Sequence, residues 1–220
     1  MTRTKRSARP GATPPKRGAG RWPILVAAAV AVLVFAVLYG VFRSNGAHPA
    51  NSAGSDQFQV GSPGTGQVAP AFTLPVAGGG TKSLADYRGK TVLLYFHEGL
   101  GCQPCWDQIR DLEKDSTGLR AARVDDLLTI TTGAPDLLAQ KMADDGLHAV
   151  ALSDTTLAVS RAYTANQYGM MGTSRDGHTF ILVGPDGQIQ WRADYGGAPN
   201  YTMYVPPAQL LTDLQNGRKP

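Results

Sequence analysis

The chain has only two cysteines, and they stand two residues apart, in Cys102-Gln-Pro-Cys105. The apolar run 91–96 comes before them and predicts a buried strand, and the amphipathic run after them predicts a helix. A strand, a short loop and a helix that begins at a C-x-x-C pair are typical of a redox-active dithiol. Two thiols at this spacing can close a small disulfide ring and reopen it.

Helix geometry predicts different roles for the two thiols. Cys102 lies at the predicted helix start, where unpaired backbone N–H groups and the helix dipole favour the attacking thiolate. We therefore expect Cys102 to be the exposed nucleophile and Cys105, one turn further on, to be the resolving thiol. Pro104 has no N–H and stiffens the turn between them. A structural disulfide is the alternative, although so short a loop stabilises the fold less than a long one.

The first 42 residues are predicted to anchor the chain in a membrane. Residues 1–21 form a basic tail with seven Lys and Arg and no acidic residue. The uncharged run 22–42 is long enough to cross a bilayer as a helix, and the basic tail predicts a cytoplasmic N-terminus. We therefore expect a single-pass protein of the plasma membrane with its redox domain outside. A cleaved signal peptide is the alternative, although its apolar region is usually ~7–15 residues long.

The rest of the chain is predicted to form a flexible linker, 43–66, and one folded domain, 67–217. The linker is rich in Gly, Ser, Ala, Asn and Pro. The net charge of +4 is set by the tail, because 13 basic residues stand against 17 acidic ones beyond Arg43. The folded part is therefore acidic, and its charge gives no reason to expect nucleic-acid binding.

Predicted strands and helices alternate within the domain and end in a hairpin. The turn Pro185-Asp-Gly187 joins the last two strands. This order predicts an α/β domain with a mixed central sheet and helices on both faces. We expect strands at 91–96, 126–131, 148–152, 178–183 and 188–192, and helices at 105–119, 134–143, 156–163 and 208–214.

Four stretches resemble the thioredoxin-fold redoxins, a group that includes the peroxiredoxin-like AhpC/TSA proteins and the TlpA-like membrane-anchored thiol–disulfide oxidoreductases. They are the G-x-x-A-P-x-F-x-L segment at 66–74, the segment before the first central strand at 83–90, the C-x-P-C stretch at 101–105 and the hairpin at 179–187. The resemblance covers about residues 66–216. It implies a thioredoxin-like fold and thiol chemistry that uses no cofactor and no metal.

The chain departs from the disulfide reductases of that group in two places. These proteins usually carry an aromatic residue before the first cysteine, where this chain has Gly101. They also carry a cis-proline just before the fourth strand, where this chain has Gly177 or His178. The resemblance therefore leaves the usual substrate-binding edge in question.

The resemblance to peroxiredoxins implies another use of the same atoms. The motif of that family is roughly P-x-x-x-T-x-x-C, with the peroxide-reactive cysteine last. In this alignment Cys105 takes the reactive position, Cys102 replaces the threonine and Glu98 replaces the proline. Arg175 is the nearest candidate for the arginine that helps to hold peroxide in the family, but it is out of register by about two residues.

The sequence leaves three functions open. The first is a membrane-tethered, extracytoplasmic thiol–disulfide oxidoreductase that acts on protein thiols or disulfides and uses a membrane or extracytoplasmic electron donor. The second is a thiol peroxidase that reduces peroxides. The third is a copper chaperone with His97 or His178 as an added ligand, although the cysteines of such proteins are usually spaced by three residues. His97 and Glu98 either tune a thiol or face water as loop residues.

Overall fold

The chain is described here by a computed structural model that covers residues 30–34 and 58–219. The chain divides into two units, Met1–Ala53 and Gly54–Pro220. Residues 30–34 are helical. None of the helices in the two described ranges is long and apolar enough to cross a membrane. The predicted basic tail, and most of the predicted membrane segment 22–42, lie outside the described residues.

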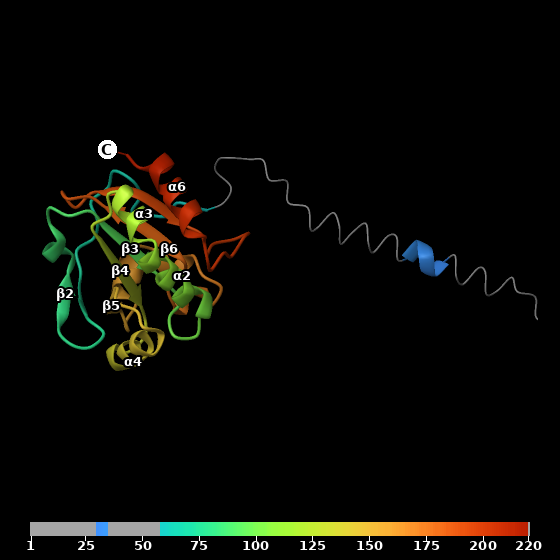
Figure 1. Cartoon of the computed structure of the whole chain (residues 1–220), viewed down its shortest axis with the longest axis horizontal. Coiled ribbons are helices and arrows are strands. Elements are labelled where there is room, and N and C mark those ends of the chain that lie inside the picture. Colours follow the sequence, from blue (N-terminus) through green and yellow to red (C-terminus); the bar gives the residue numbers. More distant parts are fainter. Residues whose placement is uncertain (1–29, 35–57, 220) are drawn as a thin grey trace, which may run out of the picture. The chain divides into compact units, whose positions relative to one another are not determined.

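A five-stranded sheet forms the centre of the second unit (Figure 1). The strand order is β5-β4-β3-β6-β7. Strands β3, β4 and β5 are parallel, whereas β6 and β7 are antiparallel to their neighbours, so the predicted mixed sheet is confirmed. The strands are β3 (Val92–Phe96), β4 (Asp126–Thr131), β5 (Val150–Ser153), β6 (Thr179–Val183) and β7 (Ile189–Asp194).

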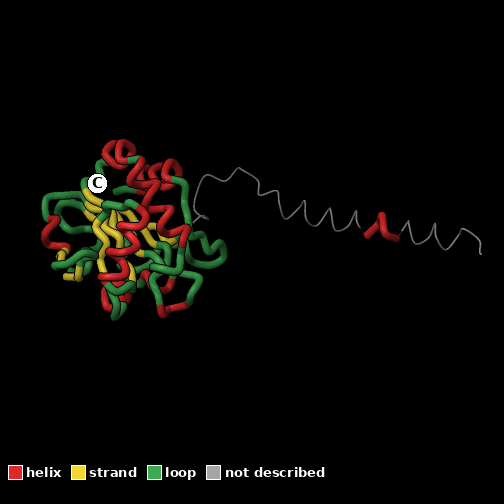
Figure 2. The backbone as a smooth tube through the Cα atoms, turned by 60° about the horizontal axis from the view of Figure 1, so that its bottom comes forward, coloured by secondary structure: helices red, strands yellow, loops and turns green. Residues whose placement is uncertain are grey.

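Each face of the sheet has its own apolar core, and Figure 2 shows the strands surrounded by helices and loops. Side chains alternate along β3, so that Leu93 and Tyr95 pack on one face and Leu94 and Phe96 on the other. The first face is covered by α2 (Gln103–Lys114), α3 (Ser116–Ala121), α4 (Pro135–Asp145) and α6 (Pro207–Gly217). The second is covered by the hairpin of β1 (Thr73–Pro75) and β2 (Thr81–Ser83), by η1 (Leu84–Tyr87) and by α5 (Ala158–Ala162).

The helix predicted at 105–119 is in fact two helices. Asp115 ends α2 and begins α3, and its carboxylate accepts the N–H of Gly118 at 3.1 Å. A carboxylate that caps a helix N-terminus satisfies a backbone donor and so favours a new start at this point. The other predicted helices and strands are present, with ends that shift by up to three residues.

Two features of the second unit were not predicted. The β1–β2 hairpin was missed because its strands have three residues each and show no apolar alternation. The last residues of the predicted linker, 58–66, also belong to the folded unit. Phe58 packs against Trp191 and Tyr195, with ring centroids 6.1 and 5.0 Å apart, and Gln59 pairs with Asp194 at the end of β7.

Candidate active site

The two cysteines form a disulfide at the start of α2. Cys102 is the N-cap residue of the helix, Cys105 lies in its first turn, and their Cα atoms are 5.4 Å apart. Cys105 is fully buried, whereas Cys102 is 8% exposed. A thiol that approaches from solvent therefore reaches the sulfur of Cys102 first.

The disulfide lies at an edge of the sheet where three strands meet. Phe96, the last residue of β3, pairs with Ile130 near the end of β4 and with Thr179 at the start of β6. The loop after β3 is held against α2, because the indole N–H of the buried Trp106 donates to the carbonyl of Gly99 at 3.1 Å. The carboxyl ends of β3 and β4 and the segment before β6 therefore surround the redox pair.

His97 and His178 lie at this edge, and both are fully buried. The Tyr95 hydroxyl is hydrogen-bonded to Nδ1 of His178 at 2.9 Å, and the His97 ring stacks on the Tyr95 ring with centroids 5.2 Å apart. The Nε2 atoms of both histidines lack a hydrogen-bond partner within the described part of the chain. Burial lowers the pKa of each imidazole to about 3, so both rings are neutral at pH 7. Of the two alternatives left open for His97, the one in which it faces water is therefore wrong.

Glu98 is also buried, and its carboxylate binds backbone instead of solvent. Its Oε1 accepts the N–H groups of Met170 and Met171. The Arg175 guanidinium donates to the carbonyl oxygen of Glu98 at 3.4 Å. Glu98, which stands where the peroxiredoxin motif has proline, thus fastens the loop 164–178 beside the disulfide.

That loop brings Arg175 to the redox pair despite its shifted register. The loop contains the short helices η2 (Ala165–Gln167) and η3 (Gly172–Ser174). A Cβ atom on Gly101, next to Cys102, would lie 3.7 Å from Nη1 of Arg175. The Arg175 guanidinium therefore lies in contact range of the residue that precedes Cys102.

A close crossing of two backbone segments lies at Gly177 and His178, where the resembled disulfide reductases carry the cis-proline. The N–H of His178 donates to the carbonyl of Tyr168 at 2.8 Å, and the N–H of Gly177 donates to the carbonyl of Ala165 at 3.0 Å. A Cβ on Gly177 would lie 1.8 Å from the Tyr168 oxygen, so only glycine permits this crossing. The segment before β6 is thus covered by its own loop.

Pro104 lies in the first turn of α2, as its missing N–H allows. It lines a hollow of about 360 Å³ together with charged side chains of α2 and Tyr204. The Tyr204 hydroxyl donates to the Asp111 carboxylate at 2.8 Å, which closes one side of this hollow. Pro104 therefore borders open surface next to the disulfide.

Two residues near the site were not predicted from the sequence. Lys141 of α4 places its Nζ 5.7 Å from the centre of the Trp106 ring. The same Nζ lies 3.2 Å from Oε1 of Gln103, the residue that follows Cys102 in the sequence. Asp176 is fully buried, and burial raises the pKa of its carboxyl group well above the usual value. Lys141 belongs to no motif, because packing between α4 and α2 brings it to the site, and the carboxylate of Asp176 is turned towards Ser160 of α5.

The described residues contain no group of three or more His, Cys, Asp or Glu that could hold a metal ion. The copper hypothesis also required two free thiolates, and here both sulfurs are in a disulfide. The geometry therefore gives the copper hypothesis no support.

Comparison with known proteins identifies a family for most of the folded unit. Residues 65–192 match the model of the AhpC/TSA family. A Mycobacterium tuberculosis protein assigned to the peroxiredoxins is 37% identical over 129 residues, which are 56% of this chain and 80% of the relative. Peroxiredoxin Bcp of Escherichia coli K12 is 30% identical over 128 residues, which are 57% of this chain and 81% of the relative.

Solved structures support the same fold. The crystal structure of peroxidoxin BcpB from Mycobacterium tuberculosis has a TM-score of 0.59 and 16% identity, and the match covers 71% of this chain and 99% of that chain. The crystal structure of the 2-Cys peroxiredoxin of Plasmodium vivax in its reduced form has a TM-score of 0.56 and 22% identity. This match covers 69% of this chain and 80% of that chain. The predicted thioredoxin-like α/β fold is therefore confirmed for the second unit.

Proposed function

The chain belongs to the AhpC/TSA family and is an oxidoreductase, and from this we propose that it is a thiol peroxidase in which Cys105 attacks the peroxide. One observation carries the proposal. Cys105, at the last position of the peroxiredoxin motif, is enclosed in the first turn of α2 and is joined to Cys102. These roles are the reverse of those that helix geometry alone predicts for the two cysteines.

The reaction has two steps in this proposal. The Cys105 thiolate attacks one peroxide oxygen, so that an S–O bond forms while the O–O bond breaks, and the leaving oxygen takes a proton to give water or an alcohol. The Cys102 thiol then attacks the Cys105 sulfenic acid, and the sulfenic oxygen leaves as water. The disulfide is the product, and an external dithiol supplies the two electrons and two protons that restore the thiols.

Two positive influences support the thiolate that this reaction needs. Both cysteines belong to the N-terminal end of α2, where the helix dipole and the unpaired backbone N–H groups favour a thiolate. The Arg175 guanidinium beside Gly101 adds a full positive charge close to Cys102. In the proposed reaction Arg175 supplies the cation that the peroxiredoxin motif expects two residues further along.

Thiol–disulfide exchange with a protein substrate is a second candidate. The exposure of Cys102, which is small but greater than that of Cys105, favours it, because a partner thiol attacks the more accessible cysteine. The replacement of the motif threonine by Cys102 also favours it, since a peroxidase loses a hydroxyl there. A membrane-tethered, extracytoplasmic setting with an electron donor on that side rests on the composition of residues 1–42.

Peroxide kinetics of the full-length reduced protein test the proposal. Trp106 lies next to Cys105, so its fluorescence should follow oxidation by hydrogen peroxide or an organic hydroperoxide. We expect a rate far above that of free cysteine, and we expect Cys102→Ser to consume one equivalent of peroxide while Cys105→Ser reacts only as a free thiol. A wild-type rate no greater than that of free cysteine would exclude the peroxidase and leave exchange through Cys102.

A further inference from the structure

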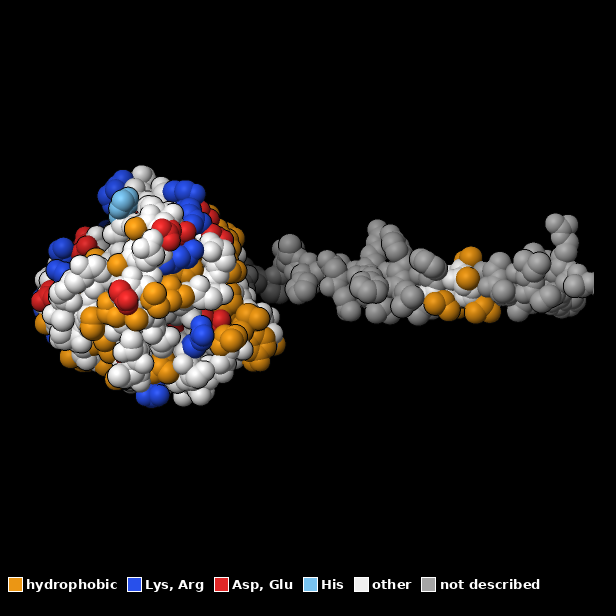
Figure 3. All heavy atoms as spheres, turned by 90° about the horizontal axis from the view of Figure 1, so that it is seen from below, with side chains coloured by type: hydrophobic (Ala, Val, Ile, Leu, Met, Phe, Trp, Pro, Cys, Tyr) orange, Lys and Arg blue, Asp and Glu red, His pale blue; other side chains and the backbone are white. Residues whose placement is uncertain are grey.

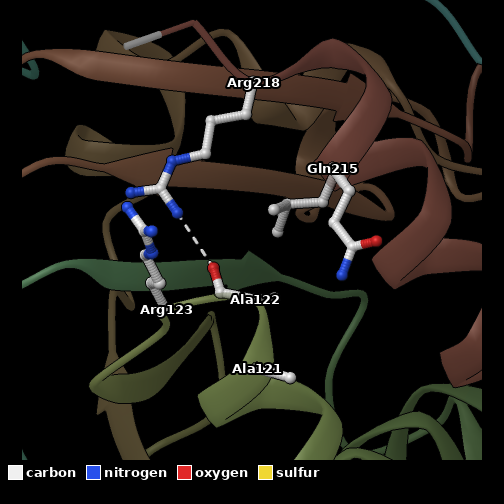
Figure 4. A pocket seen from close by; sticks show the side chains of 6 residues that line it. Ala121, Ala122, Arg123, Gln215 and Arg218 are labelled. Atoms are coloured by element: carbon white, nitrogen blue, oxygen red, sulfur yellow. Dashed lines mark hydrogen bonds between the residues drawn. The ribbon is translucent and has the colours of Figure 1, made fainter.

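Two arginines line an open hollow remote from the disulfide. The hollow has a volume of about 370 Å³ and is lined by Ala121, Ala122, Arg123, Leu214, Gln215 and Arg218 (Figure 4). It lies between the end of α3 and the end of α6, whereas the disulfide lies at the start of α2. The hollow is lined by residues of α3, α6 and the segments that follow them, and neither cysteine lines it, so it is distinct from the redox pair.

Arg123 occupies a backbone position that suits glycine. It follows the C-cap of α3 with a φ of 56°, in the left-handed region. Its N–H donates to the carbonyl of Arg120, and the next N–H, of Val124, donates to the carbonyl of Leu119, both at 2.9 Å. This is a Schellman motif, in which glycine is the usual residue and a side chain costs stability. Arginine at this position therefore lowers the stability of the fold relative to glycine.

Arg218 approaches the same hollow from α6. It is the C-cap residue of that helix, and its Nη1 donates to the carbonyl of Ala122 at 2.9 Å. Burial lowers the pKa of the Arg218 guanidinium, the positive charge of Arg123 lowers it further, and Asp125 opposes both effects. Figure 4 shows the two guanidinium groups together on one side of the hollow and the Gln215 side chain on the other.

The two positive charges are not neutralised by ion pairs. No salt bridge of residues 58–219 includes Arg123 or Arg218. The C-terminal carbonyl groups of α3 and α6 attract cations and account for the bond from Arg218 to Ala122. They do not account for arginine at position 123, since glycine would end the helix at lower cost.

We propose that this hollow binds a phosphate group. Two guanidinium groups offer planar, paired N–H donors that match the oxygens of a tetrahedral anion, and the Gln215 amide adds a further donor. The small side chains of Ala121 and Ala122 leave space for the anion. The phosphate comes either from the free ion or from the headgroup of an anionic phospholipid.

Thermal unfolding of the full-length protein in sodium phosphate and in sodium chloride, at equal ionic strength, tests the site. We expect phosphate to raise the Tm of the wild type. Arg123→Gly should fold at least as well in chloride, because glycine suits the left-handed position, but should lose the phosphate-dependent rise and bind phosphate at least about tenfold more weakly by calorimetry. Arg218→Gln should lose the rise as well.

Arg120→Gln is the matched control. Arg120 lies on the same helix, and its guanidinium donates to the Thr117 hydroxyl outside the hollow. This variant should keep the full response to phosphate. The proposal is overturned if the wild type shows no response specific to phosphate, or if Arg123→Gly responds as the wild type does.

Vesicle flotation distinguishes the two sources of phosphate. If the headgroup is the ligand, the wild type should prefer phosphatidylglycerol vesicles over phosphatidylcholine vesicles, and Arg123→Gly should lose that preference. If the free ion is the ligand, both proteins should distribute equally between the two vesicle types while their phosphate responses differ. Residues 1–57 are the same in both proteins, so any contribution from them cancels.

Discussion

Glu98 shows how a single residue can determine the surroundings of the disulfide. Its carboxylate binds two backbone N–H groups of the loop 164–178, and its carbonyl binds Arg175. A buried carboxylate with such partners fixes the loop, and the loop fixes the guanidinium next to Gly101. The catalytic role proposed for Arg175 therefore depends on Glu98 as a positioning residue.

We expect Glu98→Ala to lower both stability and the rate of reaction with peroxide. Loss of hydrogen bonds to a charged group, with two N–H groups left unpaired, should cost about 1.5–3 kcal/mol in urea unfolding. Glu113→Ala is the control, because Glu113 accepts the N–H groups of His148 and Ala149 in the same way but lies on the far end of α2. The proposed role would be refuted by equal peroxide rates in the two variants.

The buried histidines predict a loss of stability in acid. Each has a pKa of about 3 in the folded protein and about 6.5 when unfolded, so below pH 6.5 the unfolded chain binds more protons. Stability should therefore fall as the pH drops from 6.5 towards 3, by up to about 1.4 kcal/mol per pH unit for each histidine. His97→Gln should reduce this slope in urea titrations, and a slope equal to that of the wild type would contradict the prediction.

At the scale of the elements, helix α3 is placed against α6 by a glycine. A Cβ on Gly118 would lie 2.6 Å from the Leu211 side chain and 2.5 Å from the Asp115 carboxylate that caps α3. Gly118→Ala should therefore cost about 1–3 kcal/mol, although alanine is the better helix former by about 1 kcal/mol. Chemical denaturation checks this, with the exposed Thr117→Ala as control. A more stable Gly118→Ala variant would show that α6 can move away.

The elements also show how far the sequence can predict this fold. The central strands were predicted because each is buried on both faces and is therefore a continuous apolar run. The break between α2 and α3 at Asp115 was not predicted, because local helix propensity does not distinguish an N-cap aspartate from an aspartate on the exposed face of a continuous helix. The cysteines were found by their spacing, but the loop 164–178 depends on contacts with Glu98 and on the crossing at Gly177, which connect distant parts of the chain.

At the scale of the whole molecule, a buried ion pair ties the first described residues of the unit to the sheet. Arg192 and Asp194 of β7 are both buried, with Nε and Oδ2 2.8 Å apart. Asp194 also accepts the N–H of Gly61 at 2.6 Å, and Arg192 donates to the carbonyl of Pro63 at 3.0 Å. Residues 58–64 thus complete the hydrogen bonding of charges that are otherwise costly to bury.

We expect a fragment of residues 67–220 to be less stable than one of residues 54–220. The shorter fragment loses the aromatic packing of Phe58 and leaves the Arg192–Asp194 pair with missing partners. The loss should be at least about 1–3 kcal/mol, the cost of leaving a buried donor or acceptor without its partner. Urea unfolding of both fragments measures this loss. Equal unfolding midpoints would show that residues 54–66 add no stability and that the folded domain begins at residue 67, as the sequence predicts.

Figure 3, which views the molecule from the end where α4 lies, shows hydrophobic side chains in patches between charged ones. Leu100, Met170 and Met171 are exposed apolar residues on the two loops that surround the disulfide. We expect reductants that carry an apolar contact surface to react fastest with Cys102.

The position of Cys102 at the N-cap of α2 has a consequence for how the protein survives oxidative stress. Its sulfur already lies within bonding distance of the deeper one, so an oxidised Cys105 can be trapped without any melting of α2. Under excess oxidant, irreversible damage requires a second oxidant molecule to arrive before this closure. With both sulfurs in the disulfide, the oxidised protein carries no free thiol at this site and should tolerate peroxide levels that would inactivate an exposed thiol.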